Sequence, residues 1–187
     1  MGPTDEELVA AVQAGDVSAF DVLVSRWDRK IRGAAFRVLG SDEDARDVSQ
    51  EAFLRAFRAL KSFKREARFS SWLYQIAMNL CRDRLRRRAG RNHMSLDEVA
   101  EHGEPALQAR PVALEALETR DVARAVSAAV ESLSEDHREV VVLKEYEGLT
   151  FPEIAEVLGL PLSTVKTRLY RALGQLRVEL ERQGFAS

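Results

Sequence analysis

The residues best suited to contact a polyanion lie between Phe69 and Arg91, where aromatic rings, an amide and a run of arginines share one predicted helix. From position 82 onward a single acid, Asp83, stands against six arginines: Arg82, Arg84, Arg86, Arg87, Arg88 and Arg91. Such a face attracts phosphates. The rings of Phe69, Trp72 and Tyr74 offer flat surfaces to unstacked bases. The segment therefore predicts binding to opened nucleic acid, and an ordinary solvated helix face is the alternative.

Charge is strongly segregated along the chain, although the formal net charge is only −2. Residues 64–91 carry 9 basic and 2 acidic side chains, and residues 160–187 carry 5 and 2. Residues 92–159 lie between them and carry 5 basic and 15 acidic side chains. Two separated cationic islands suggest two contacts along one extended polyanion.

The composition predicts an all-α protein made of two small domains. The chain has 187 residues and 45% hydrophobic content, and its apolar side chains recur at helical spacing. Cys81 is alone, which indicates a buried thiol in a reducing compartment rather than a disulfide framework. No segment approaches the roughly 18 apolar residues of a membrane span. We therefore expect a cytoplasmic protein with no membrane insertion.

Stop and start signals divide the chain. Gly40 predicts a helix end, and Ser41 can cap the next helix, which is expected to run through Asp47 to Leu60. Helical periodicity fades between about Gly90 and Pro111, where glycine, proline and polar residues predominate. The predicted organisation is a first domain at 1–91, a flexible linker at 92–113 and a second domain at 114–187.

The second domain contains the pattern of a helix-turn-helix between Phe151 and Tyr170. Thr150 and Glu153 can form a capping box, and Gly159 lies at the turn. The second helix is expected to bury Val165, Leu169, Leu173 and Leu176 and to present a polar face to a major groove, made of Ser163, Lys166, Thr167, Tyr170 and Arg171. Arg168 is expected to contact a phosphate. A plain αα-hairpin of a helical bundle is the alternative.

Four stretches in order resemble the bacterial sigma factors of the sigma-70 family, in the compact extracytoplasmic-function group. They are residues 44–53, 69–88, 95–98 and 151–170. The resemblance implies a promoter-specificity subunit without catalysis of its own, whose partners are core RNA polymerase and promoter DNA. It also implies an anti-sigma factor as a regulator, for which the acidic segment 92–159 is a possible contact.

The resemblance assigns roles to individual residues. It implies docking on the polymerase by Asp47, Gln50, Glu51 and Phe53, although Phe53 could equally belong to the core. It implies minus-10 recognition, with a loop at 64–70 and Asn79 receiving a flipped base, by Lys64, Arg65, Arg68, Phe69, Asn79, Arg82 and Arg86. It implies minus-35 recognition by Ser163, Thr164, Lys166, Thr167, Arg168, Tyr170 and Arg171.

Two other classes explain less of the sequence. A stand-alone helix-turn-helix regulator with a sensory amino-terminal domain gives no reason for the arginine run. A DNA-processing enzyme such as a recombinase would need a catalytic group, whereas the three histidines are scattered without metal-ligand spacing and no glycine-rich phosphate loop precedes a helix. We therefore predict no cofactor, no metal and no catalytic residue.

Overall fold

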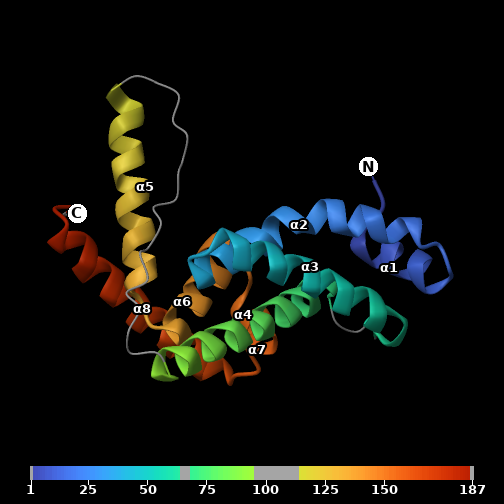
Figure 1. Cartoon of the computed structure of the whole chain (residues 1–187). Helices are drawn as coiled ribbons and strands as arrows, with labels where there is room; N and C mark the ends of the chain where they lie inside the picture. Colours follow the sequence, from blue (N-terminus) through green and yellow to red (C-terminus); the bar gives the residue numbers. More distant parts are fainter. Residues whose placement is uncertain (1, 64–67, 95–113, 186–187) are drawn as a thin grey trace.

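The computed structural model describes residues 2–63, 68–94 and 114–185, and every regular element in these ranges is helical (Figure 1). The amino-terminal half holds α1 (Asp5–Gln13), α2 (Ser18–Leu39), α3 (Asp42–Ala59), the short η1 (Leu60–Ser62) and α4 (Phe69–Met94). The carboxyl-terminal half holds α5 (Leu114–Ser132), α6 (Glu135–Val141), the π-helical η2 (Val142–Tyr146), α7 (Phe151–Leu158) and α8 (Leu162–Arg182). The all-α prediction is confirmed.

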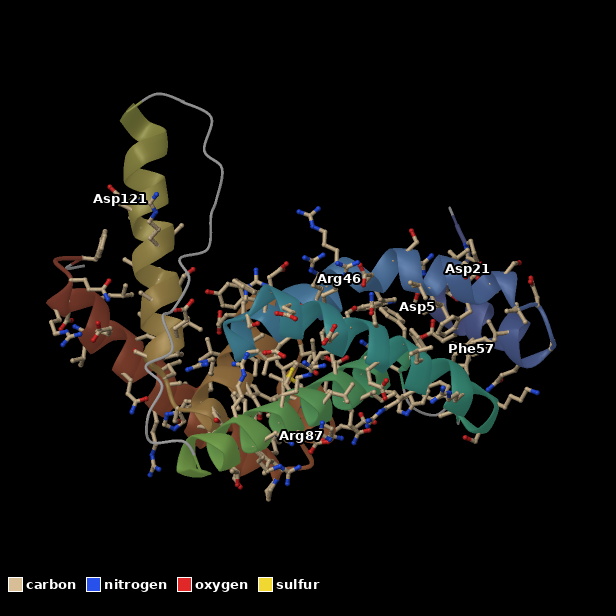
Figure 2. All side chains as sticks on the ribbon, viewed as in Figure 1. Asp5, Asp21, Arg46, Phe57, Arg87 and Asp121 are labelled. Carbon is tan, nitrogen blue, oxygen red and sulfur yellow. The ribbon has the colours of Figure 1, made fainter. Side chains whose placement is uncertain are left out.

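The first half is a bundle in which α2, α3 and α4 pack against one another and α1 packs against α2. Gly40 ends α2 in the left-handed region, with φ of 68°, and the Ser41 hydroxyl accepts a hydrogen bond from the Asp44 amide, so both predicted signals are confirmed. Figure 2 labels Asp5 on α1, whose carboxylate accepts a 2.9 Å hydrogen bond from the Trp27 ring of α2. These contacts fix α1 and α3 around α2.

The helix that carries the arginine run is longer than expected. The sequence predicts this helix as far as Arg91, and α4 continues through Gly90 and Arg91 to Met94. Because a single glycine in a helix costs only about 1 kcal/mol, favourable neighbours can carry the helix through it. The remainder of the predicted linker, residues 95–113, lies outside the described residues. The boundaries of the two domains stay a prediction.

The second half is built around the predicted helix-turn-helix. Thr150 and Glu153 form the capping box at the start of α7, and Gly159 ends α7 with φ of 64°. On α8, Val165 and Leu169 are buried as expected, but Leu173 is 38% exposed and Ala172 is buried instead. The core-facing stripe therefore steps by three residues after Leu169, because 3.6 residues per turn do not allow an unbroken spacing of four.

The two halves are in direct contact. Helix α7 lies along α4, and α2 packs against α6 and η2 (Figure 1). The buried apolar side chains of both halves belong to one continuous cluster. The sequence indicated two domains and gave no basis for placing them relative to each other, so this contact is a result of the structure alone.

Candidate nucleic-acid interface

One face of α4 carries most of the residues expected to read minus-10 DNA that the structure describes. Arg68 just before the helix, and Asn79, Arg82 and Arg86 within it, follow one another at intervals that keep them on one side of a helix. Phe69 begins the helix, whereas Lys64 and Arg65 lie outside the described residues. The same side of α4 faces α6 and α7 of the second half.

The strongest polar contact across this face joins Arg82 on α4 to Glu139 on α6. The Arg82 Nε donates to Glu139 Oε1 at 2.8 Å, and its Nη2 donates to Oε2 at 2.7 Å, which is a bidentate ion pair. Glu139 is only 1% exposed. Burial raises the pKa of its carboxyl above the usual range, although the hydrogen bond from Arg82 opposes this shift. The guanidinium fork that could hold a phosphate therefore holds a carboxylate.

A second buried contact lies nearer the start of α4. The Tyr74 hydroxyl donates a hydrogen bond to a carboxylate oxygen of Glu147, which follows η2. Arg37 of α2 lies 4.0 Å from the other oxygen of Glu147 and stacks over the Tyr146 ring at 4.3 Å. Burial and the neighbouring Glu147 raise the pKa of Tyr74 far above its usual range. The hydroxyl therefore stays protonated and remains a donor.

Further contacts join α4 to α7. Arg68 Nη1 donates to Glu153 Oε1 at 2.8 Å, and the Gln75 amide donates to the Glu156 backbone carbonyl. The Glu153 carboxylate also caps α7 through Thr150, and these hydrogen bonds together with Arg68 lower its pKa. Three acidic side chains of the second half, Glu139, Glu147 and Glu153, therefore bond to Arg82, Tyr74 and Arg68.

A cleft of about 560 Å³ remains open between α4 and α6. Its walls are formed by the predicted minus-10 residues Asn79, Arg82 and Arg86 together with acidic side chains, namely Asp83, Glu135, Asp136 and Glu139. Asn79 is exposed within it, and Arg86 pairs with Asp83 on its own helix. The structure thus brings these three predicted residues together, but in surroundings that contain more acids than bases.

The aromatic rings are less available than the sequence suggested. Phe69 is 1% exposed and Tyr74 is 2% exposed, so neither ring can stack on a base in this conformation. Trp72 is half-buried, and its ring centroid lies 4.7 Å from that of Phe63. The rings of Phe69 and Tyr74, which the sequence offered to unstacked bases, are instead packed around the start of α4.

Part of the arginine run has a structural task that the sequence did not reveal. Arg84 forms ion pairs with Asp44 and Asp47 on α3, and Arg88 pairs with Asp44 and donates to the Leu39 carbonyl. Burial alone would raise the pKa of Asp44, but the hydrogen bond from Arg84 and the charges of Arg88 and Arg84 outweigh it and lower that pKa. These arginines fasten α4 to α3, so the cationic face is smaller than its sequence indicates.

Only some of the predicted polymerase-docking residues on α3 are exposed at the surface. Asp47 and Gln50 are exposed, and Glu51 pairs with Arg55 at 2.8 Å. Phe53 is buried and packs edge-on against Phe20, so in this structure it belongs to the core. The neighbouring apolar side chain Leu54 reaches solvent, at 51% exposure. A groove of about 370 Å³ between α3 and α4 is lined by Asp47, Gln50, Glu51 and Leu54, among others.

The predicted minus-35 face of α8 is open. Ser163, Lys166, Thr167 and Arg171 are exposed, Thr164 is half-buried, and Tyr170 reaches 66% exposure. The Thr167 hydroxyl donates to the Ser163 carbonyl at 2.9 Å. These side chains leave α8 opposite its buried Val165 and Leu169, as a groove-reading helix requires.

Arg168 is the exception on α8. Its Nη2 pairs with Asp136 of α6 at 2.7 Å, and its side chain is 24% exposed. The contact joins the recognition helix to its own half. A phosphate contact by Arg168 would have to compete with Asp136, so this role stays a prediction.

Other candidate chemistry is limited. Cys81 is buried, and burial raises the pKa of its thiol to about 12, which agrees with an inert structural cysteine. Within the described ranges no three histidine, cysteine, aspartate or glutamate side chains are placed to hold a metal ion. None of the helices found there is long and apolar enough to cross a membrane.

Comparisons with known proteins match both halves. The family model described as Sigma-70 region 2 matches residues 23–91, and the model described as Sigma-70, region 4 matches residues 123–176. The RNA polymerase sigma-H factor of Pseudomonas aeruginosa is 38% identical over 173 residues, which cover 90% of this chain and 89% of that protein. The ECF RNA polymerase sigma-E factor of Haemophilus influenzae is also 38% identical, covering 90% and 91%.

The fold has solved counterparts. The structure of CnrH in complex with the cytosolic domain of CnrY is similar with a TM-score of 0.69 and 29% sequence identity, over 95% of this chain and 97% of that one. The likeness therefore extends over both halves.

Proposed function

The chain belongs to the sigma-70 family, in its extracytoplasmic-function group, and we propose that it reads promoter DNA through two separate faces, one on α4 and one on α8. As a sigma factor it binds core RNA polymerase and directs promoter-specific transcription initiation. Membership in this family replaces the readings as a stand-alone regulator or a recombinase. The observation that carries the proposal is the exposed polar face of α8 behind an intact helix-turn-helix.

We assign duplex minus-35 DNA to α8. Lys166 and Arg171 can donate to guanine acceptors or phosphates, and Thr167 and Tyr170 can contact a base edge or a methyl group. Ser163 and Thr164 lie in the first turn, where exposed helix amides favour a phosphate. All of these side chains sit on one rigid helix, which is what reading several neighbouring base pairs requires.

We assign melted minus-10 DNA to α4. Asn79 has an amide that can pair with the edge of an extruded base, and Arg68, Arg82 and Arg86 can follow the phosphates of one strand. The cost of unstacking a base, a few kcal/mol, is offset by these contacts. Binding that favours the open strand shifts the equilibrium of duplex opening without chemical fuel.

The polymerase contact falls on α3. Asp47, Gln50 and Leu54 are exposed along the groove between α3 and α4 and offer polar, acidic and apolar groups to a partner. Through this contact the polymerase would hold the two DNA faces at a fixed separation, so that two modest contacts reinforce each other. We propose that the chain supplies no catalysis of its own and works in the cytoplasm, where the polymerase and the chromosome meet.

A protein regulator is part of the proposal. One solved protein of similar fold, CnrH, is in complex with the cytosolic domain of CnrY. We propose a regulator of the anti-sigma type for this chain, which would act by covering the faces on α3, α4 or α8. Its identity and its signal lie outside the chain.

The decisive experiment is reconstitution with core RNA polymerase on fragmented genomic DNA, with sequencing of transcript start sites. We expect starts to cluster behind shared minus-35 and minus-10 sequences. The double variant Asp47→Ala, Gln50→Ala should lose both core binding and selective starts, whereas Glu43→Ala, an exposed acid at the start of the same helix, should keep both. Start sites no more selective than those of core alone would remove the proposed function.

A further inference from the structure

We propose that Gln13 is a positioning residue for minus-10 recognition, because its side-chain amide, at the end of α1, holds the turn after η1 against the start of α4. The inference rests on the proposed function, since it concerns the strand-reading face of α4. Helix α1 lies before residues 23–91, which the Sigma-70 region 2 family model matches. That match therefore assigns no role to α1.

The Gln13 side chain bridges two backbone carbonyls that lie far from it in the sequence. Its Nε2 donates to the Leu60 carbonyl at 2.9 Å and to the Phe63 carbonyl at 3.1 Å. An amide nitrogen of this kind carries two hydrogens, so it can serve both acceptors at once. Gln13 is half-buried. Because a carbonyl that is removed from water and left without a donor is destabilising, the amide restrains both ends of this turn.

The end of η1 needs a donor from elsewhere in the chain. The last carbonyls of a helix have no partner within the helix. Helices α2 and α7 end on Gly40 and Gly159, which adopt left-handed conformations and close the last turn with their own amides. By contrast, η1 ends on Phe63 in an extended conformation, with φ of −65° and ψ of 124°. The chain leaves η1 without a glycine cap, and α1 supplies the donor instead.

Helix α1 is itself firmly attached, so it can act as a fixed support. Leu8 and Val9 are buried in the apolar core. Asp5 accepts a 2.9 Å hydrogen bond from the Trp27 ring and pairs with Arg26. The helix packs against both α2 and η1, at the end of the first half where Figure 2 labels Asp5. The amide at the last position of α1 is therefore presented by a rigid element.

The turn that Gln13 holds carries Phe63, whose ring joins it to the start of α4. The centroid of the Phe63 ring lies 4.7 Å from that of Trp72 and 6.4 Å from that of Phe69. Arg68, which we assign to the melted strand, directly precedes Phe69. A displacement of the turn would therefore disturb the ring contacts at the place where the strand-reading face of α4 begins.

An ordered face of this kind favours the correct strand over a wrong one. A site that is already in its binding geometry loses less conformational entropy when the ligand binds, and its apparent affinity scales with the fraction of molecules in that geometry. Phosphate contacts carry no sequence information, whereas base contacts depend on the placement of individual side chains. Loss of the Gln13 amide should therefore lower selectivity for minus-10 bases as well as affinity.

The test uses holoenzyme reconstituted from core RNA polymerase and the full-length chain, on a promoter recovered by start-site mapping. One probe is this promoter with its minus-10 element held open by mismatches. The second probe has randomised bases in the same opened segment of the non-template strand. The measured quantity is the ratio of the affinities for the two probes. A variant that merely reduces the folded fraction weakens both affinities equally and leaves this ratio unchanged.

Three substitutions of Gln13 separate hydrogen bonding from packing. Gln13→Met keeps the length of the side chain and removes the donors, and Gln13→Glu keeps the shape but offers only acceptors when ionised. Gln13→Lys restores a donor group at this position. The matched control is Ser62→Ala, because the Ser62 hydroxyl donates to the Ala59 carbonyl at 2.8 Å and is a second side-chain hydrogen bond at the same helix end.

We expect the affinity ratio to fall about fivefold in Gln13→Met and Gln13→Glu, and to stay within about twofold of the parent in Gln13→Lys and Ser62→Ala. Parent-like selectivity in Gln13→Met would overturn the positioning role. Equal losses in Gln13→Met and Gln13→Lys would also overturn it, because packing rather than donation would then be responsible. If Gln13→Met does not fold, the comparison of Gln13→Glu with Gln13→Lys decides by the same ratio.

The same measurements separate this inference from the proposed function. A parent holoenzyme that binds both opened probes equally would count against minus-10 reading itself. A selective parent beside an equally selective Gln13→Met would remove only the role of Gln13 and leave the proposed function standing.

Discussion

Asn79 has the geometry of a base-binding amide. It is exposed on the wall of the cleft between α4 and α6, beside the Arg82 and Arg86 guanidiniums. An amide offers a donor and an acceptor to the edge of an extruded base, and we assign this contact to the DNA after it has melted. We expect Asn79→Ala to weaken promoter opening by about tenfold and to leave closed-complex binding nearly unchanged.

Permanganate reactivity of minus-10 thymines measures the opening step, and filter binding at low temperature measures the closed complex. The pair of assays serves as its own control, because both use one preparation of polymerase and one promoter. Equal loss in the two steps would show that Asn79 acts before melting, or only on folding, and would remove the base-binding role.

Lys166 and Arg171 carry the corresponding prediction on α8. Both are exposed on the face that we assign to the major groove. Alanine at either position should weaken minus-35 binding by about 1 to 3 kcal/mol and relax base preference if the contact is to a base. Arg177→Ala is the matched control, since Arg177 is exposed farther along α8 and pairs with Glu181. Promoter selection that returns the parent sequence preference would refute the base contact.

Individual residues show where the sequence was sufficient and where it was not. The spacing of Asn79, Arg82 and Arg86 is enough to put them on one side of a helix, because that depends on local geometry alone. The burial of Tyr74 depends on Glu147, 73 positions away, and no local pattern contains it. Phe53 is buried and Leu54 is exposed for a similar reason, because the Phe53 ring packs against Phe20 of α2, which is distant in the sequence.

The sequence predicted where helices begin and end better than it predicted which side chains of a helix are buried. Helix ends depend on capping hydrogen bonds and backbone dihedral angles within a few residues, as at Ser41, Thr150 and Gly159. The local sequence is therefore enough to predict them. The exposed Leu173 and the continuation of α4 past Arg91 depend on which neighbours a helix meets. The unpredicted pairing of Arg84 and Arg88 with α3 belongs to the same group, because it is a contact between helices.

The tie between α3 and α4 makes a prediction about acid stability. The folded chain holds the pKa of Asp44 below its ordinary value, so the ionised carboxylate stabilises the fold at neutral pH. That contribution is complete above the ordinary aspartate pKa of about 4 and is lost as the pH falls through the lower folded-state value. We expect Asp44→Asn to lower Tm most at pH 7, with the difference shrinking in acid.

Thermal melts followed by circular dichroism between pH 7 and pH 3 test this. Asp42→Asn is the control on the same first turn of α3, where Asp42 pairs with Arg32 at the exposed surface. Such a pair contributes little, so the control should shift Tm only slightly. A Tm difference for Asp44→Asn that is independent of pH would mean that packing, not the charge of Asp44, holds α3 to α4.

At the scale of the whole molecule, the segregated charges also contact one another within the folded chain. The two basic islands were predicted to contact one polyanion, and the acidic stretch between them had no assigned partner within the chain. In the folded chain, acids of the segment 92–159 meet the first basic island through Glu139 and Glu153. The sequence shows that these segments carry opposite charges, but only the fold shows that they form ion pairs with each other.

A continuous core also predicts how the molecule unfolds. Both tryptophans, Trp27 and Trp72, lie in the first half, so their fluorescence reports that half alone, whereas far-ultraviolet circular dichroism reports the helices of both. Because one apolar cluster spans the halves, we expect the two melting curves of the parent chain to coincide. Glu139→Gln should separate them, since each half then melts with its own stability. Parent curves already several degrees apart would show that the halves unfold independently and that their contact adds little to either.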